Sequence, residues 1–389
     1  MKNIGLLLLL VFKISFGYSQ TDNFQLYLDS AKNLFKSAAN LSGEELQHFD
    51  YQNILPLLNE AIALNGQSAE AYYYMAYTYS RMNSMDANGL LDMNLEWVQK
   101  ASDALKKCIT IAPNYTGEII ALDPYSKLTS EWGALAASYL YDNKQQAARS
   151  TFIEGKNQGG FSEFLLAIHR KMLDACAPNA LLISSGDIQF FPLIYLQVVE
   201  GYRTDVAIID AGLLNTQWYA SFLSENNIVH FDLPSDSLKS ISYLEWPAQN
   251  QNIGKFTWQV PPSLYDQYLL RGNRLLLSLL KQNNFEREVC FGAFFPQDSW
   301  LGLQDYCDQH LFVNVLNPSK KGKLNFNTCK EEFIFLLDTS WSTINLHSVN
   351  ELQMYDIYYQ GMYEVIHKYF SKSKKAEELL EIIDAAPVH

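Results

Sequence analysis

The chain has 389 residues, of which 48% are apolar and 18% charged, so it can bury the cores of two or three domains. This composition excludes an intrinsically disordered chain. A formal charge of −13 argues against a nucleic-acid-binding protein, which normally presents a basic face.

Residues Met1–Gln20 have the pattern of a secretory signal peptide. Lys2 gives a positively charged start, Leu6–Phe12 is a short apolar run, and Gly17–Gln20 offers a cleavage region before Thr21. The apolar run is too short for a membrane span, and no cysteine follows it as a lipoprotein signal would require. We therefore expect an exported, periplasmic protein that is not a lipoprotein and has no transmembrane segment in its mature chain.

Helical periodicity runs from about Asn23 to Ala175 without a convincing strand. Within it, one run of small and aromatic residues has the spacing of a helix pair that ends at a proline. Its members are Ala71, Tyr72, Met75, Ala76 and Tyr79, then Ala101, Leu105, Cys108 and Pro113. This pattern resembles a tetratricopeptide repeat, with extra residues inserted around Met82–Asn94.

Flanking residues extend this resemblance to about two or three degenerate units between residues 24 and 158. They are Ile54, Leu58 and Ala61 before it, and Trp132, Ala136, Tyr139, Ala148 and Phe152 after it. Stacked repeats form a solenoid whose concave face commonly binds proteins. We expect Tyr72, Tyr73 and Tyr74 to be exposed and to contribute to such a surface, although a short spacer without a binding groove stays an alternative.

The second half begins with the pattern of a βαβ unit. Two short apolar runs, Leu181–Ser185 and Val206–Asp210, bracket the helical period of Phe191–Gly201, in which a helix is expected to start at Pro192. Short apolar runs of this kind are typical of parallel strands buried on both faces.

Similar elements follow to the end of the chain. We expect helices at Gln217–Asn226, Leu264–Lys281, Leu301–His310, Met354–Phe370 and Ala376–Ile383, strands at Ile228–Asp232, Glu288–Phe295 and Leu311–Leu316, and an irregular stretch at Ser235–Pro262. The alternation predicts a Rossmann-like, mostly parallel sheet covered by helices. The expected organisation is a signal peptide (1–20), a helical domain (21–160), an α/β domain (161–345) and C-terminal helices (346–389).

Several separated blocks of the second half resemble one family in the same order. They are Ala177–Ala180, Gly186-Asp187, Phe191–Leu193, Tyr195–Gln197, Val199–Gly201, Arg203–Val206, Leu213–Thr216 with Trp218-Tyr219, and then Phe291, Leu301–Leu303 and Asp305-Tyr306. The family is the Bacteroidetes O-mannosyltransferase-like membrane proteins, in which such blocks belong to a soluble extracytoplasmic segment. The resemblance covers about residues 175–370.

Two departures separate this chain from that family. The membrane-spanning portion, where the family's glycosyl transfer takes place, has no counterpart here. The family's Asp-x-Asp near the end of the first strand is Asp187-Ile-Gln189, so the second carboxylate is lost. The resemblance therefore implies a shared extracytoplasmic module and not a shared enzyme activity.

Polar residues follow the two strands of the βαβ unit. Asp187 comes after the first strand, and Asp210, Asn215, Thr216 and Trp218 end or follow the second. Since ligands of parallel sheets bind at the carboxyl ends of strands, these residues are the candidate ligand-binding site. The alternative is that Asp187 and Asn215 cap turns or helices and that Trp218 belongs to the core.

Other motifs that carry chemistry are missing from the sequence. It contains no glycine-rich phosphate loop, no HExxH pair and no GxSxG elbow, and its five cysteines are scattered without a CxxC. We expect buried thiols at Cys108 and Cys290, and a bridge between Cys307 and Cys329 stays open. We assign no catalytic residue, no metal and no cofactor.

These features favour a non-catalytic adaptor or accessory subunit of a Bacteroidetes cell-envelope complex, acting in outer-membrane protein assembly, secretion or glycosylation. Its partners would be other envelope proteins and not nucleic acid. The alternative function is a glycan-binding or glycan-processing module that uses the crevice at the strand ends of the α/β domain.

Overall fold

The computed structural model describes residues 21–38, 40–41, 43–85, 87–319, 324–371 and 373–386. The expected signal peptide therefore lies outside the described residues. Contacts divide the chain into two compact units, with the division between Glu131 and Trp132, inside helix α6 (Pro124–Tyr141). We call them the helical unit and the α/β unit, and we describe each by itself.

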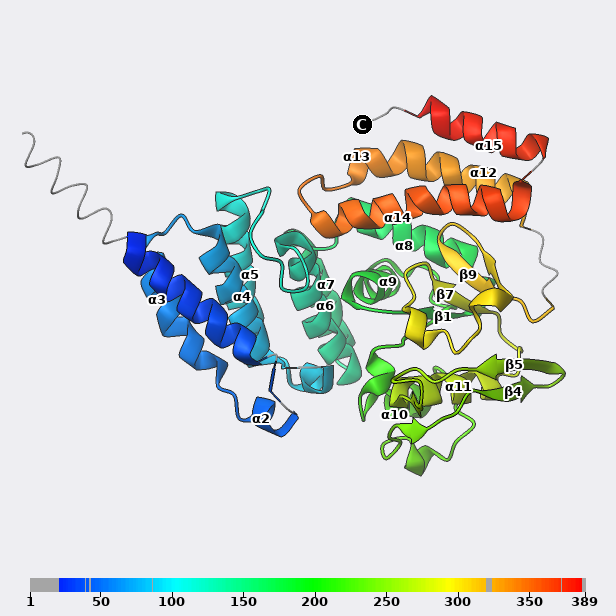
Figure 1. Ribbon diagram of the computed structural model, residues 1–389, viewed down its shortest axis with the longest axis horizontal. Helices are drawn as coiled ribbons and strands as arrows, with labels where there is room; N and C mark the ends of the chain where they lie inside the picture. Colours follow the sequence, from blue (N-terminus) through cyan, green and yellow to red (C-terminus); the bar gives the residue numbers. More distant parts are fainter. Residues whose placement is uncertain are drawn as a thin grey trace, which may run out of the picture. The chain divides into compact units, whose positions relative to one another are not determined.

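The described residues of the helical unit form helices and single turns and no strand. Residues 21–38 are helical and are followed by α2 (Gly43–Gln47), α3 (Leu55–Leu64), α4 (Ala69–Asn83) and α5 (Leu95–Ile111), which Figure 1 shows in blue to cyan. Side-chain caps fix two of the starts, because Ser68 accepts a hydrogen bond from the amide of Ala71 and Asn94 from that of Glu96.

Helices α4 and α5 form the helix pair that the sequence predicts, and small residues lie where they pack. Ala71, Ala76 and Ala101 are fully buried. The extra residues between the helices include the single turn η2 (Ala87–Asp92). Asn83 binds the main chain of Asn94 through both its side-chain oxygen and its nitrogen, which ties the two ends of this connection together.

The tyrosine run of α4 differs from its expected exposure. Tyr73 and Tyr74 are fully buried, and only Tyr72 is partly exposed. Consecutive helical residues point about 100° apart, and here Tyr73 and Tyr74 fall on the side that faces the core. The expectation that these two side chains are exposed is therefore wrong.

The α/β unit contains one mixed five-stranded sheet. Its order is β2 (Ala207–Asp210), β1 (Leu181–Ser184), β7 (Val289–Gly292), β9 (Val313–Leu316) and β8 (Cys307–Gln309). The first three strands are parallel, and β9 runs antiparallel to both β7 and β8. The sheet is therefore mixed where the sequence pattern predicted a mostly parallel one, because β8 and β9 form an antiparallel pair.

Helices cover both faces of this sheet. Helix α9 (Asp187–Glu200) connects β1 to β2 and packs against α7 (Gln145–Asn157) and α8 (Glu163–Ala175). Figure 1 shows α8 and α14 (Val349–Val365) above the sheet and α10 (Tyr219–Glu225) and α11 (Arg271–Asn283) below it. The connection from β1 to β2 and the connection from β2 to β7 run in opposite directions across the sheet. Right-handed connections therefore place α9 and α11 on opposite faces.

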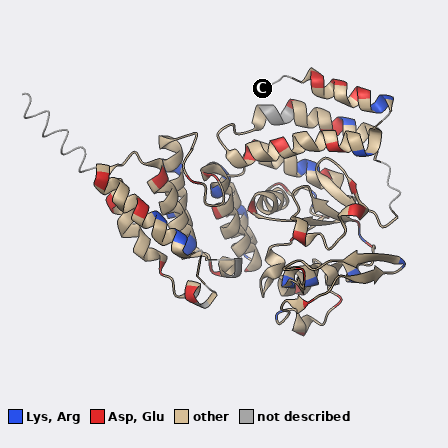
Figure 2. Ribbon diagram, in the orientation of Figure 1, with Lys and Arg blue, Asp and Glu red and all other residues tan. Residues whose placement is uncertain are grey.

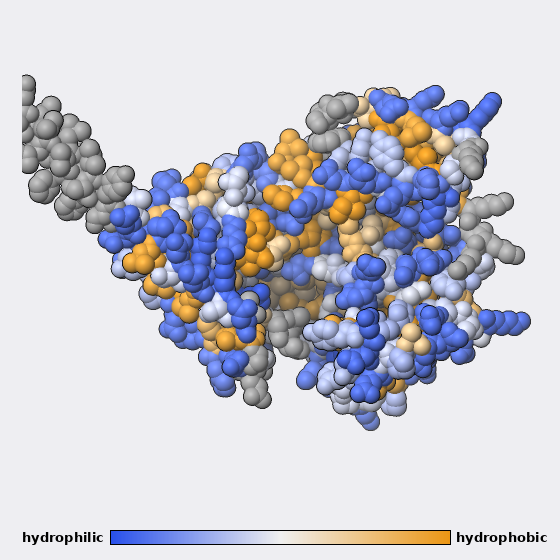
Figure 3. Space-filling model, in the orientation of Figure 1, coloured by the Kyte–Doolittle hydropathy of each residue, from blue (hydrophilic) through white to orange (hydrophobic). Residues whose placement is uncertain are grey.

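The described residues between 326 and 385 are mainly helical. They include α12 (Phe326–Phe335), the short α13 (Trp341–Thr343), α14 and α15 (Lys374–Ala385). Figure 3 shows apolar surface over these helices, whose exposed apolar side chains include Ile334, Ile357 and Leu380. In Figure 2, acidic and basic residues are interspersed along the helices of each unit.

Two expected elements are wrong because backbone geometry interrupts them. The helix expected at 301–310 is a single turn, η6 (Gln304–Tyr306), followed by β8, since Leu301 and Gly302 have φ angles of 54° and 75°. A Cβ on Gly302 would lie 2.4 Å from the main-chain oxygen of Gln259, so only glycine fits there. Helix α11 begins at Arg271 and not near residue 264, because Tyr265 and Asp266 also have positive φ.

The stretches 228–232 and 235–262 also differ from expectation. Val229 and Phe231 are buried, but the main chain forms no strand, and the amide of Asp232 bonds to Ser278 in α11. The stretch expected to be irregular contains the hairpin of β4 (Gln249–Ile253) and β5 (Phe256–Val260). Gly254 has φ +57 at the first position of its two-residue turn, which suits a hairpin, whereas amide-rich β4 has a low strand propensity.

A tyrosine hydroxyl binds the outer main chain of each edge strand of the sheet. The amide of Asp210 in β2 donates to the hydroxyl of Tyr219 over 3.2 Å, and the amide of Gln309 in β8 donates to that of Tyr369 over 2.7 Å.

Among the described residues, no helix is long and apolar enough to cross a membrane.

Candidate functional site

The structure brings Asp187 and Asp210 to the same edge of the sheet. Strand β1 ends at Ser184, and Gly186, with φ +83, turns the chain into α9, which begins at Asp187 and not at Pro192. Strand β2 ends at Asp210 beside it. Asp187 is exposed, whereas the side chain of Asp210 is buried.

The carboxylate of Asp210 holds the two loops at this edge together. One oxygen accepts from the amide of Gly186 over 3.0 Å, and the other accepts from the amide of Leu213 over 2.8 Å. The pKa of Asp210 is raised to about 7, mainly by burial and also by the nearby charge of Asp187, and the amide hydrogen bonds oppose this rise. The side chain is therefore a carboxyl group that titrates near neutral pH.

Gln189, in the first turn of α9, is buried beside the end of β1. Its oxygen accepts from the amide of Ser185 over 2.9 Å, and its buried amide nitrogen has no hydrogen-bond partner. A Cβ on Gly292, at the end of β7, would lie 2.3 Å from this side-chain oxygen. The close contact with Gly292 explains why a glycine ends that strand, which the sequence alone does not reveal.

Asn215 and Thr216 bind neighbouring main-chain groups. The side-chain oxygen of Asn215 accepts from the amide of Gly272 in the first turn of α11 over 2.9 Å, and its nitrogen donates to Gly212. Thr216 is buried and donates to the carbonyl of Leu213 over 2.7 Å. Asn215 therefore fixes the loop after β2 against α11, and Thr216 braces the same loop internally.

Trp218 belongs to an aromatic cluster beside β2. Its ring centroid lies 4.6 Å from that of Tyr141 and 5.4 Å from that of Tyr219, and Phe222 completes the cluster. A cavity of about 280 Å³ adjoins the cluster, with Tyr141, Phe222 and Ile208 in its lining. The candidate residues thus form three groups: the carboxyl groups of Asp187 and Asp210, the main-chain hydrogen bonds of Asn215 and Thr216, and the aromatic cluster that contains Trp218.

Arg271 is a further anchor of this edge that sequence reasoning missed. Its buried guanidinium donates to the carbonyls of Thr216, Leu238, Lys239 and Ile241. Desolvation lowers the pKa of this arginine. No signal in the sequence predicts this role, because the carbonyls that Arg271 binds are 30 to 55 residues away.

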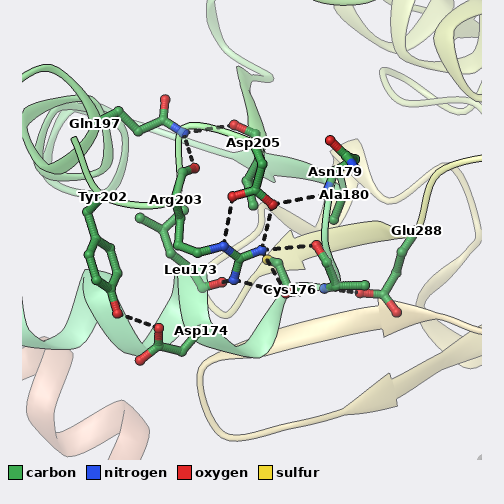
Figure 4. A network of polar contacts seen from close by, with 12 residues as sticks. Leu173, Asp174, Cys176, Asn179, Ala180, Gln197, Tyr202, Arg203, Asp205 and Glu288 are labelled. Carbon is green, nitrogen blue, oxygen red and sulfur yellow. Dashed lines mark hydrogen bonds and ion pairs between the residues drawn. The ribbon is translucent and has the colours of Figure 1, made fainter.

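The amino-terminal ends of β1 and β2 carry a second arginine network, which Figure 4 shows from close by. Arg203 forms an ion pair with Asp205 and donates to the carbonyls of Leu173, Cys176 and Ala177. The ion pair with Arg203 lowers the pKa of Asp205. Since Asp205 also accepts from the amide of Asn179, this network joins the end of α8 to the starts of β1 and β2.

Comparison with protein families identifies a part of this region. The model of TMEM260-associated domain 2 matches residues 166–240, which include the Arg203 network and the candidate site up to Trp218. TMEM260 is an O-mannosyltransferase-related protein. Comparisons with curated proteins and with solved structures found no match.

The chemistry available at this site follows from the two carboxyl groups. Asp210 exchanges a proton near neutral pH, as a general acid or base must, but both of its oxygens are bonded to amides of the protein. Among the described residues, no group of three or more His, Cys, Asp or Glu side chains is arranged to hold a metal ion.

Proposed function

We propose that this protein is a non-catalytic periplasmic adaptor or accessory subunit of a Bacteroidetes cell-envelope complex that serves outer-membrane protein assembly, secretion or glycosylation. The observation that carries the proposal is the hydrogen bonding of the side chains at the strand ends. Asp210, Asn215 and Thr216 all bond to main-chain groups of the protein itself. Side chains that brace loops in this way support a presenting surface better than a reaction centre.

The helical unit supports the same proposal. The pairing of α4 with α5, the buried Ala76 and Ala101 at their contact, and the end of α5 just before Pro113 agree with a degenerate tetratricopeptide unit. Repeats of this kind act mainly by binding other proteins. The match to a TMEM260-associated domain supports glycosylation among the three processes.

Affinity purification from the native envelope tests this function. The tagged chain is cross-linked in cells and recovered from a detergent extract, and the captured proteins are identified by mass spectrometry. We expect a defined set of envelope proteins that a tagged, exported control protein does not capture. Recovery of the chain alone, running as a free monomer on a native gel, would contradict the adaptor function.

A second candidate function is glycan binding at the strand-end crevice. The observation that favours it is the carboxyl group of Asp210, whose pKa is raised to about 7 by burial and by the neighbouring Asp187. Perturbed carboxyl groups in a crevice are common at functional sites. Thermal-shift screening of glycans and nucleotide sugars, repeated with Asp187→Ala and Asn215→Ala, tests it. A shift that both substitutions abolish supports glycan binding, and the lack of any shift excludes it.

A further inference from the structure

Residues 113–123, which we call the strap, connect α5 to α6 without regular secondary structure. The strap is longer than the usual helix–helix connection of about two to eight residues. The strap lies against α4 and the helix of residues 21–38. Every contact described below lies within the helical unit.

Two buried tyrosine hydroxyls bind the main chain of the strap. The hydroxyl of Tyr73 accepts from the amide of Ile120 over 3.0 Å and donates to the carbonyl of Leu122 over 2.8 Å. The hydroxyl of Tyr77 accepts from the amide of Leu122 over 2.8 Å and donates to its carbonyl over 3.0 Å. These bonds go to main-chain groups of the strap, so they do not depend on the identity of its side chains.

Two side chains of the strap supply specificity. The ring of Tyr115 is buried and stacks on Tyr73 with a centroid distance of 4.7 Å. Glu118 pairs with Lys36 over 2.7 Å and accepts from the hydroxyl of Tyr74 over 2.9 Å. The bond with Lys36 lowers the pKa of Glu118. The surface thus holds an aromatic residue and, three positions later, an acidic one.

We propose that this face of α4 and the helix of residues 21–38 is a receptor for an acidic segment of a partner protein, and that the strap occupies it as an internal ligand. The segment has an aromatic residue three positions before a glutamate or aspartate. The inference rests on the adaptor function and deepens it, since it names the kind of segment that an envelope partner presents.

A peptide that copies the strap tests the proposal. The full chain carries Tyr115→Ala and Glu118→Ala, which remove both side-chain anchors and leave Pro113 and the helix-capping Asp123 in place. A fluorescent peptide of residues 113–123 is titrated into this variant and into the wild type. We expect saturable binding to the variant and at least tenfold weaker binding to the wild type, whose own strap competes at a high effective concentration.

Matched substitutions on the receptor face test whether the peptide binds there specifically. Lys36→Glu or the pair Tyr73→Phe and Tyr77→Phe, added to the strap variant, should weaken peptide binding at least tenfold. Lys100→Glu, which also breaks an exposed ion pair but lies on α5, should leave it unchanged. No binding by a folded strap variant, or binding that ignores Lys36→Glu, overturns the proposal, even if envelope partners are still captured.

If the strap variant does not fold, hydrogen exchange of the wild-type protein tests the proposal instead. Excess peptide should accelerate exchange at the amides of Ile120 and Leu122, which lose their tyrosine acceptors when the strap is displaced. Unchanged exchange at both amides overturns the proposal.

Discussion

The helical unit and the α/β unit both hold irregular segments by bonding side chains to main-chain groups, but they use different chemistry. In the helical unit, the neutral hydroxyls of Tyr73 and Tyr77 bind the strap. In the α/β unit, the guanidinium of Arg271 and the carboxyl group of Asp210 bind the loops at the sheet edge. The hydroxyls and the charged groups differ in whether they bind amides, carbonyls or both, and in how their hydrogen bonds respond to pH.

A tyrosine hydroxyl both donates and accepts, so one side chain satisfies an amide and a carbonyl of the same segment. An arginine only donates and a carboxylate only accepts, so the α/β unit needs both to hold comparable loops. Burying those charges also carries a larger desolvation penalty than burying neutral hydroxyls. We therefore expect the anchors of the α/β unit to be more sensitive to substitution and to pH.

The largest effect is expected for Arg271→Met. The substitution keeps the length of the side chain but leaves the carbonyls of Thr216, Leu238 and Ile241 without their donor. We expect a loss of about 3 kcal/mol in the free energy of unfolding, measured by urea denaturation. Arg274→Met is the control, because its one bond to Ser242 is exposed, and a loss below about 1 kcal/mol is expected. Equal losses would contradict a special role for Arg271.

The pH dependence of stability is expected to be the next largest effect. The pKa of Asp210 is raised to about 7 in the folded chain, against about 3.9 in the unfolded chain. The folded state therefore binds the extra proton between these values, and its stability falls as pH rises through this window by up to about 1.4 kcal/mol per pH unit.

Denaturation at about pH 5 and about pH 7 checks this expectation for Asp210. The wild type should lose about 2 kcal/mol more than Asp210→Asn, which has no carboxyl group to titrate there. The variant is the necessary reference because burial also raises the pKa of Glu332 to about 7. Parallel pH profiles for the two proteins would show that Asp210 does not titrate in this window.

A smaller effect is expected for Tyr73→Phe in the helical unit. The ring stays in place, but the amide of Ile120 and the carbonyl of Leu122 each lose a partner. We expect a loss of about 1.5 kcal/mol that does not vary between about pH 5 and about pH 8, because no charge is involved. Tyr72→Phe on the same helix is the matched control and should change stability by less than about 0.5 kcal/mol.

The smallest effect is expected for Lys36→Met. Its ion pair with Glu118 is about half exposed, since the side chains have exposed fractions of 49% and 40%. Solvent screens such pairs, so we expect a change below about 0.5 kcal/mol that disappears in high salt. A large loss would show that the charge and not the hydroxyls holds the strap, which would reverse the comparison between the units.

Local patterns predicted much of the α/β unit. The apolar runs that begin at Leu181 and end at Asp210 form the parallel pair of β1 and β2, since strands buried on both faces need such runs. The shared edge also brings Asp187 and Asp210 together, as expected for parallel strands. The strand direction of β9 could not be predicted, because an apolar run is the same in a parallel and in an antiparallel pairing.

Contacts between distant residues account for what sequence reasoning missed. The partner of Asn215 is the amide of Gly272, 57 residues later, and the partner of Tyr73 is the amide of Ile120, 47 residues later. The hydroxyl of a buried tyrosine usually needs such a partner, so the run Tyr72–Tyr74 alone does not show which ring faces inward. The tetratricopeptide assignment, the signal peptide and the periplasmic location stay predictions.

The tyrosine hydroxyls at the edge strands β2 and β8 also affect how the chain behaves at high protein concentration. Open strand edges recruit strands from neighbouring molecules and start aggregation. Here Tyr219 and Tyr369 each occupy an outward amide that a foreign strand would need. The same pairing of hydroxyl with main chain that fastens the strap thus protects the sheet from extension by a second copy of the chain.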